Sequence, residues 1–280
     1  MGKQGRQRKG GYTLITGASS GIGYELAKVF ARNGFNLVLV ARNRDRLETV
    51  AKELARDYMA DCRVIPADLS MMSGVEEVHK RVRESNLTVS ILVNDAGMGT
   101  YGPFRETDFE KEAQMVNLNV VGLTYLTRLF VREMVANRSG RILNVASVVG
   151  FWPVPNMSVY AATKAYVVSF SQSLASELSG TGVQVSVLCP PAVHTNFLKE
   201  GQEKMTDPHS GGVAGVLERM RHADAASVAT IAYRDLMKGR KVIIPSAFYQ
   251  AFRIIMKFVP QGLVSDLRAR SHRKKSSDRH

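Results

Sequence analysis

Cysteine is scarce in this sequence, with only Cys62 and Cys189 among 280 residues. Two cysteines cannot build a disulfide framework, so the small secreted domains that depend on disulfides are excluded. Both lie in apolar runs, and we expect them to be buried free thiols in a reducing, intracellular setting.

Long apolar runs are missing as well. No uninterrupted apolar segment reaches the roughly 20 residues that a membrane-spanning helix requires. The basic start of the chain has no apolar stretch behind it, so we expect no signal peptide and a cytoplasmic protein. Hydrophobic residues nevertheless make up 45% of the chain, which argues against disorder and suffices for one large α/β domain.

Acidic residues are too few to balance the basic ones, and the net charge is +13. Residues 1–10 contribute +4 and residues 268–280 contribute +5, which leaves +4 for the rest of the chain. Tails of this kind are typically solvated and disordered. The alternative is attraction to an anionic membrane surface or to nucleic acid. Beyond charge the sequence has no nucleic-acid-binding motif, so we expect no specific nucleic-acid partner.

Short β-branched runs alternate with helical patterns along residues 11–245. We expect strands at 12–16, 36–41, 63–66, 89–94, 141–146, 183–188 and 241–244, and helices near 21–33, 43–58, 71–86, 107–137, 158–179 and 222–238. Strands that are apolar almost throughout belong to a parallel sheet covered on both faces. The pattern predicts a single Rossmann-type doubly wound α/β domain of about seven strands. A lid is expected at about 192–218, a basic tail at 1–10, and an apolar helix with a basic tail at 246–280.

A glycine-rich segment, Thr16-Gly17-Ala18-Ser19-Ser20-Gly21-Ile22-Gly23, directly follows the first predicted strand and opens a helix. Glycines allow a tight turn and a close approach to phosphates, and the N–H groups at a helix N-terminus hold negative charge. The spacing G-x-x-x-G-x-G in this context predicts a dinucleotide phosphate site. The residues assigned to this site are Gly17, Ser19, Ser20, Gly21, Ile22 and Gly23.

A second pattern lies downstream, where Ser147 precedes a Tyr160-x-x-x-Lys164 pair by thirteen residues. Tyr160 and Lys164 share one face of a predicted helix. Tyrosine is a poor base near neutral pH, but an ammonium group and the positive ring of an oxidised nicotinamide cofactor would lower its pKa. The pair can then move a proton at a carbonyl.

Together, the glycine spacing and the Ser–Tyr–Lys set resemble the classical short-chain dehydrogenase/reductase family over about residues 10–245. The resemblance implies that Tyr160 transfers the proton, Ser147 holds the substrate oxygen, and Lys164 also binds the nicotinamide ribose. It further implies a fourth catalytic group, an asparagine that orders a water next to Lys164. The family pattern selects Asn119 for this role, with Asn117 as the competing choice.

The end of the second strand indicates which nicotinamide cofactor is used. An acidic residue there would bind the ribose 2′-hydroxyl of NAD, but the sequence reads Ala41-Arg42-Asn43. Arg42 is placed to pair with a 2′-phosphate, and Arg46 adds charge one turn later. We therefore predict NADP(H) rather than NAD(H). The alternative is that Arg42 is a solvated loop cation.

The resemblance assigns further cofactor contacts to loops that follow the other strands. They are Asp68, Leu69, Asn94, Ala96, Gly97, Pro190, Val193 and Thr195. Asp68 has an alternative role as the N-cap of the next helix. Two positions depart from the family pattern, since Asp95 stands where a second asparagine is usual and Pro191 where glycine is usual. We carry no role over to Asp95, and we expect Pro191 to stiffen the segment that follows it.

Apolar side chains near the predicted site suggest a bulky or lipid-like carbonyl substrate. The candidate pocket residues are Met98, Tyr101, Phe104, Val149, Phe151, Trp152, Met157, Phe197, Leu198 and Met205, and ordinary core packing is the alternative for each. Residues 246–259 are also very apolar, with Arg253 and Lys257 one turn apart. Such a helix packs on its own domain or on a neighbouring subunit, or it lies at a membrane surface as a peripheral contact.

We therefore expect an NADP(H)-dependent oxidoreductase that interconverts a carbonyl and an alcohol on a small molecule, in the direction of reduction. No metal ligands are assigned. Homo-oligomers, either dimers or tetramers, are common in the resembled family. Two rivals remain. One is epimerisation through transient oxidation, against which the glycine spacing argues. The other is a non-catalytic NADPH-binding sensor or scaffold that uses its basic tails for membrane or nucleic-acid contact.

Overall fold

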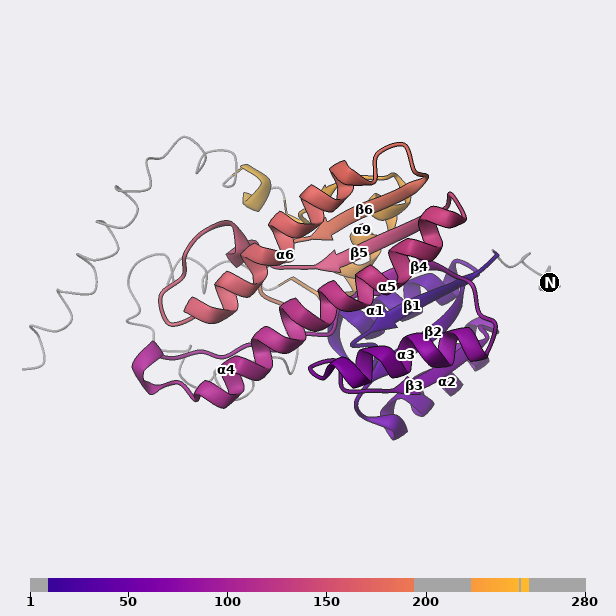
Figure 1. Cartoon of the computed structure of the whole chain (residues 1–280), viewed down its shortest axis with the longest axis horizontal. Coiled ribbons are helices and arrows are strands. Elements are labelled where there is room, and N and C mark those ends of the chain that lie inside the picture. Colours follow the sequence, from indigo (N-terminus) through magenta and orange to yellow (C-terminus); the bar gives the residue numbers. More distant parts are fainter. Residues whose placement is uncertain (1–9, 194–222, 247, 252–280) are drawn as a thin grey trace, which may run out of the picture.

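A single parallel sheet of seven strands forms the centre of the molecule (Figure 1). The structure is a computed structural model, and it describes residues 10–193, 223–246 and 248–251. The strands are β1 (Tyr12–Thr16), β2 (Asn36–Ala41), β3 (Cys62–Pro66), β4 (Val89–Asn94), β5 (Gly140–Val145), β6 (Val183–Leu188) and β7 (Val242–Ile243). Their order across the sheet is β3-β2-β1-β4-β5-β6-β7. The predicted doubly wound α/β fold is therefore confirmed.

The helices connect successive strands and lie around the sheet (Figure 1). They are α1 (Gly21–Arg32), α2 (Arg44–Tyr58), α3 (Met72–Glu84), α4 (Phe109–Val116), α5 (Leu123–Ala136), α6 (Ser158–Glu177) and α9 (Ala225–Met237). Shorter 3₁₀ turns occur at η1 (Phe104–Glu106) and η3 (Val148–Phe151), and η2 (Asn117–Gly122) is a π-helical turn. These boundaries differ from the predicted ones by only a few residues, apart from the interruption at η2.

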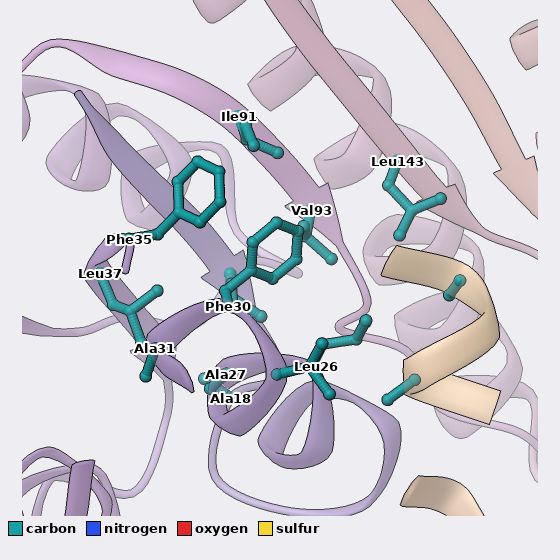
Figure 2. Packing of buried hydrophobic residues seen from close by; sticks show 14 of the residues in the cluster. Ala18, Leu26, Ala27, Phe30, Ala31, Phe35, Leu37, Ile91, Val93 and Leu143 are labelled. Carbon is teal, nitrogen blue, oxygen red and sulfur yellow. The ribbon is translucent and has the colours of Figure 1, made fainter. Parts of the chain in front are cut away.

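Strand side chains alternate between two hydrophobic layers, as the pleat of a sheet requires. On one face, Ile15 of β1 belongs to a cluster with α1, α2 and α9. Figure 2 shows part of this cluster, where Phe30 of α1 points toward Val93 of β4. On the other face, Leu14 of β1 packs with α3 and α5. Because both faces are covered, nearly every strand residue is apolar, which is the pattern that the sequence displays.

The strand order reverses between β1 and β4, so the carboxyl ends of these two strands open the crevice where parallel α/β sheets bind ligands. The loop after β1 carries the glycine-rich segment, and the loop after β4 carries Asn94 to Gly97. The loop after β5 carries Ser147. Three of the predicted motifs thus share one edge of the sheet.

The helix predicted over 107–137 is divided in the structure by the π-helical turn η2. The reason is a close approach at Gly122, where an added Cβ would collide with the carbonyl oxygen of Leu69. A π-helical turn inserts extra backbone and rotates the following residues, and such turns occur often at functional sites. Here it brings Asn119 into the interior, where its exposed fraction is 1%.

The two cysteines differ in burial. Cys189 is fully buried, as expected, but Cys62 is only half-buried. Cys62 begins β3, which is an edge strand with a neighbour on one side only. The expectation that both thiols are buried is therefore wrong for Cys62, because an edge strand receives less cover.

The chain beyond β7 begins by packing on its own domain. Tyr249 is buried in a cluster that includes Ile244, and the Gln250 side-chain amide donates to the Ile244 carbonyl at 2.7 Å. Phe248 is exposed. The rest of the predicted C-terminal helix, the two basic tails and most of the predicted lid lie outside the described residues. Within the described ranges, no helix is both long enough and apolar enough to cross a membrane.

Candidate active site

The glycine-rich loop turns tightly from β1 into α1. Gly17 has a φ of 70°, and an added Cβ on Gly23 would lie 2.5 Å from the Gly17 carbonyl oxygen. Only glycine permits this packing without displacement. Ser20 is the N-cap residue of α1, but its side chain makes no capping hydrogen bond. The N-terminal N–H groups of α1 therefore form a suitable cradle for a phosphate.

Two arginines lie at the start of α2, close to this loop. Arg42 directly follows β2 and is exposed. The Arg46 guanidinium donates through Nε to the Ser19 carbonyl oxygen at 3.2 Å, which attaches α2 to the glycine-rich loop. Asn43 caps α2 by accepting from the Arg46 N–H at 2.9 Å. This end of the sheet thus presents positive charge beside the proposed phosphate cradle.

Asp68 lies in the turn that follows β3. Its carboxylate accepts from the Ser70 N–H at 2.9 Å and from the Ser70 hydroxyl at 2.7 Å. The N-cap residue of α3 is Met71, so the alternative that Asp68 caps this helix is wrong. Leu69 is buried beside it in the core on the α3 side.

Tyr160 and Lys164 are both buried on α6, next to the loop after β5. The Lys164 ammonium donates to the Val145 carbonyl oxygen at 3.0 Å and lies 5.7 Å from the centre of the Tyr160 ring. The Tyr160 hydroxyl and the Ser147 side chain are hydrogen-bonded. The three side chains therefore form one contiguous group at the carboxyl end of β5.

Asn119 is held by hydrogen bonds on both sides of its amide. Its Oδ1 accepts from the Met98 N–H at 3.0 Å, and its Nδ2 donates to the Met98 carbonyl at 2.9 Å. Nδ2 also donates to the Thr163 hydroxyl on α6 at 3.1 Å. The competing residue Asn117 is exposed. An added Cβ on Gly97 would lie 3.2 Å from Asn119 Oδ1 and 3.5 Å from Lys164 Nζ, so the asparagine and the lysine border the same small space.

Burial dominates the pKa values in this group. It raises the pKa of Tyr160, and the negative charge of Asp95 raises it further, whereas the hydrogen bond from Ser147 lowers it. Burial lowers the pKa of Lys164 to about 8, opposed chiefly by the attraction of Asp95. This differs from the expectation that the lysine holds the tyrosine pKa down. The reason is that desolvation outweighs the ammonium, while the positive nicotinamide ring that the expectation also invoked comes from the cofactor.

Asp95 is the part of the site to which the sequence assigned no role. Its carboxylate accepts a hydrogen bond from the Gly23 N–H, and burial raises its pKa to about 7. The backbone N–H groups of Asp95 and Ala96 both donate to the Thr16 hydroxyl, at 3.0 and 2.9 Å. Its departure from the family pattern was the only signal in the sequence, because its contact with the glycine-rich loop depends on the fold.

Asn94, predicted as a cofactor contact, has its side chain in the protein interior. Its Nδ2 donates to the Thr127 hydroxyl at 2.9 Å and to the Asn144 Oδ1 at 2.8 Å. Asn144 in turn donates to the Ser171 hydroxyl of α6 at 2.9 Å. In this structure Asn94 therefore joins β4 and β5 to the helices that cover them.

The segment after β6 supports the Ser147 loop. The Pro190 carbonyl accepts from the Val148 N–H at 3.0 Å and from the Ser147 hydroxyl at 3.5 Å. Val193 forms an isolated bridge with Ala223. Thr195, the last predicted cofactor contact, lies outside the described residues.

The candidate pocket residues divide by burial. Val149 and Trp152 are buried, whereas Phe104 is 66% exposed. Four are half-buried, namely Met98, Tyr101, Phe151 and Met157. Phe197, Leu198 and Met205 lie outside the described residues. Phe104, in the short turn η1, has too little cover in this structure for a pocket wall.

Comparison with known proteins agrees with this geometry. The family model described as short chain dehydrogenase matches residues 12–206, which is more than half of the chain. The chain belongs to the short-chain dehydrogenase family. Members of this family are oxidoreductases that act on CH–OH and C=O groups with a nicotinamide cofactor.

Solved structures of this family superpose over most of the chain. A short-chain dehydrogenase from Sphingobium yanoikuyae in complex with NADPH is 34% identical, with a TM-score of 0.77, and the match covers 91% of this chain and 95% of that one. A bulky-bulky ketone specific alcohol dehydrogenase from Comamonas testosteroni is 32% identical, with a TM-score of 0.72 and coverages of 90% and 95%. A family member from Burkholderia phymatum in complex with NAD is 27% identical, with a TM-score of 0.77 and coverages of 89% and 93%.

Among curated relatives, a very-long-chain 3-oxoacyl-CoA reductase from Danio rerio is 32% identical over 203 residues. The match covers 71% of this chain but only 63% of that protein. The similarity therefore supports the family and the general reaction, and it leaves the substrate to be argued from the site.

Proposed function

We propose that this short-chain dehydrogenase is an NADP(H)-dependent carbonyl reductase that acts on an apolar or bulky small molecule. The observation that carries the proposal is the buried group of Ser147, Tyr160 and Lys164 beside the crevice at the β1 and β4 ends. A nicotinamide dinucleotide fits the residues present, because the α1 N-terminus has no side-chain cap from Ser20 and Arg46 is attached to the same loop. When bound, that cofactor supplies the hydride.

The chain's own residues supply the proton and hold the substrate oxygen. Ser147 donates to the carbonyl oxygen and stabilises the negative charge that develops on it. Tyr160 gives its hydroxyl proton to the same oxygen, since its raised pKa keeps it protonated at neutral pH. Lys164 binds the nicotinamide ribose, and Asn119 orders a water that connects the lysine to solvent. The proton on Tyr160 is replaced through this path.

Arg42 carries the proposed preference for NADP(H). It follows β2, where a carboxylate would favour NAD, and it is free of the burial that would restrict its reach. Arg46 adds a second positive charge at the same end of α2. The similar Sphingobium protein binds NADPH, while the similar Burkholderia protein binds NAD, so the choice rests on Arg42 rather than on family membership.

The proposed substrate class rests on the apolar surroundings of Ser147. Val149 and Trp152 lie just after it, and Met98 and Met157 lie in the same hydrophobic cluster. The Comamonas relative acts on bulky ketones and the Danio rerio relative is a 3-oxoacyl-CoA reductase, by their names. A homo-oligomer, with peripheral membrane contact through residues 246–280, completes the proposal.

The test is the consumption of NADPH and NADH with a panel of carbonyl compounds: steroids, fatty aldehydes, 3-oxoacyl thioesters, quinones and sugars. We expect turnover with NADPH on one of the apolar classes and much slower turnover with NADH. Turnover on sugars alone would refute the substrate class. Tight NADPH binding with no turnover on any class would favour the sensor or scaffold alternative.

A further inference from the structure

The carboxylate of Asp95 lies directly beneath the glycine-rich loop. Asp95 follows β4, and its backbone is fixed to the end of β1 through the Thr16 hydroxyl. Its Oδ2 lies 3.0 Å from the position that a Cβ on Gly17 would occupy and 2.6 Å from the same position on Gly23. It accepts a hydrogen bond from the Gly23 N–H, in the first turn of α1. The loop is therefore folded onto this acid.

The position matters because α1 has no acidic residue of its own in its first turn. A helix N-terminus carries about half a positive charge, which attracts a carboxylate and a phosphate alike. Asp95 occupies the inner side of this positive end. The phosphates of a dinucleotide would occupy its outer side. Two anions would then share one helix end in a place from which the ligand has removed water.

The other charges around Asp95 do not remove this conflict. Lys164 of α6 attracts the carboxylate, and Tyr160 of the same helix interacts with it while neutral. Burial holds the pKa of Lys164 at about 8, so its charge is itself lost in mildly alkaline solution. On the loop side, the Arg46 guanidinium is bonded to the Ser19 carbonyl at 3.2 Å. Burial of Asp95 already disfavours its charged form before a ligand arrives.

We propose that Asp95 takes up a proton from solvent when the phosphates of a dinucleotide occupy the glycine-rich loop, so that this residue makes cofactor affinity depend on pH. The proposal rests on the proposed function only in taking a dinucleotide as the ligand of the loop. Asp95 acts through the N-terminus of α1 and is a positioning residue. Where an asparagine stands at this position, no such proton is needed.

The direction of the pH effect follows from linkage. Below a pKa of about 7 the free Asp95 is already neutral, and binding carries no extra cost. Above that pKa the free carboxylate is charged and must be protonated on binding. The dissociation constant for the cofactor therefore rises with pH, by up to about tenfold per pH unit. The rise stops once the pH exceeds the pKa of Asp95 in the bound state.

The test compares the wild type with Asp95→Asn, which removes the charge and keeps an oxygen that can accept from Gly23. NADPH binding is measured by titration calorimetry from pH 6.5 to 8.5, in pairs of buffers with different ionisation enthalpies. At pH 8 we expect the wild type to take up close to one proton more per NADPH than the variant. We also expect its dissociation constant to rise about tenfold more than that of the variant between pH 7 and pH 8.5. Titration of the 2′-phosphate is common to both proteins and cancels in this comparison.

The control is Asp45→Asn, which removes an exposed acid from the first turn of α2. It should bind NADPH with the proton uptake of the wild type. A merely structural role of Asp95 would change affinity by the same factor at every pH. Equal proton uptake and equal pH slopes in the wild type and Asp95→Asn would therefore overturn the proposal.

If Asp95→Asn does not fold, the wild type decides the question with ADP-ribose, which carries the pyrophosphate but no 2′-phosphate. Proton uptake on binding ADP-ribose at pH 8, with a midpoint near pH 7, is the expected result, and no uptake contradicts the proposal. Tight NADPH binding without extra proton uptake refutes the role of Asp95 alone. No binding of NADPH or ADP-ribose at any pH refutes both this role and the proposed function.

Discussion

At the scale of single residues, the protonation of Tyr160 decides the direction in which the site is suited to work. Burial and the charge of Asp95 raise its pKa, and only the hydrogen bond from Ser147 lowers it. A tyrosine that stays protonated can donate to a carbonyl oxygen, but it must first lose its proton to act on an alcohol. The residue therefore favours reduction, in keeping with the expected use of NADPH.

Arg42 supports a prediction about the cofactor. Arg42→Asp should reverse the preference, with a loss of about 10- to 100-fold in kcat/KM for NADPH and a smaller change or a gain for NADH. The matched control is Lys52→Asp, the same charge reversal at an exposed position further along α2. Steady-state kinetics with both cofactors measure the ratio. An unchanged ratio in Arg42→Asp would show that this arginine is only a solvated loop cation.

At the scale of elements, sequence periodicity predicted the strands and helices because a sheet covered on both faces leaves nearly continuous apolar strands. The catalytic residues were equally accessible, since Ser147, Tyr160 and Lys164 keep a spacing set by one strand end and one helix turn. The π-helical turn was not predictable, because it depends on the approach of Gly122 to the Leu69 carbonyl. The perturbed acid Asp95 was missed for the same reason: its neighbours come from a different strand–helix unit.

The turn from β1 into α1 gives an element-scale prediction. In Gly23→Ala, the new methyl group would lie 2.5 Å from the Gly17 carbonyl oxygen and 2.6 Å from Asp95 Oδ2. The loop must shift, so we expect a loss of about 1–3 kcal/mol in the free energy of unfolding, together with weaker NADPH binding. Chemical denaturation and fluorescence titration measure the two effects.

The control for this substitution is Gly10→Ala, where an added methyl group meets nothing within 4 Å. It should unfold and bind NADPH as the wild type does. If Gly23→Ala matches Gly10→Ala in both measurements, the glycine-rich loop is not packed as described.

At the scale of the whole molecule, function depends on segments that only the sheet order brings together. The glycine-rich loop, the Asp95 loop and the Ser147 loop follow β1, β4 and β5, which are adjacent in the sheet. The charge is distributed differently, since most of the net charge of +13 belongs to the sequence outside residues 11–267. Chemistry and basicity are thus carried by separate parts of the chain.

The basic tails predict salt-dependent binding to anionic vesicles. At low ionic strength the full chain should sediment with vesicles that contain phosphatidylserine, and about 0.5 M salt should release it, because charge screening shortens the attraction. A chain of residues 10–251, which keeps the buried Tyr249, is the control and should stay in solution. Sedimentation of the full chain with neutral vesicles, persisting in high salt, would instead indicate an apolar interfacial helix within 252–280.

The most direct test of the account is NADPH-dependent carbonyl reduction by Tyr160→Phe, which removes only the hydroxyl group. NADPH affinity and turnover are measured on the same samples, with the carbonyl compound that the wild type reduces best. We predict that NADPH binding is kept, while kcat falls by about 10²- to 10⁴-fold, the usual contribution of a general acid. Turnover by Tyr160→Phe at the rate of the wild type would contradict the account, because the proton would then come from another group.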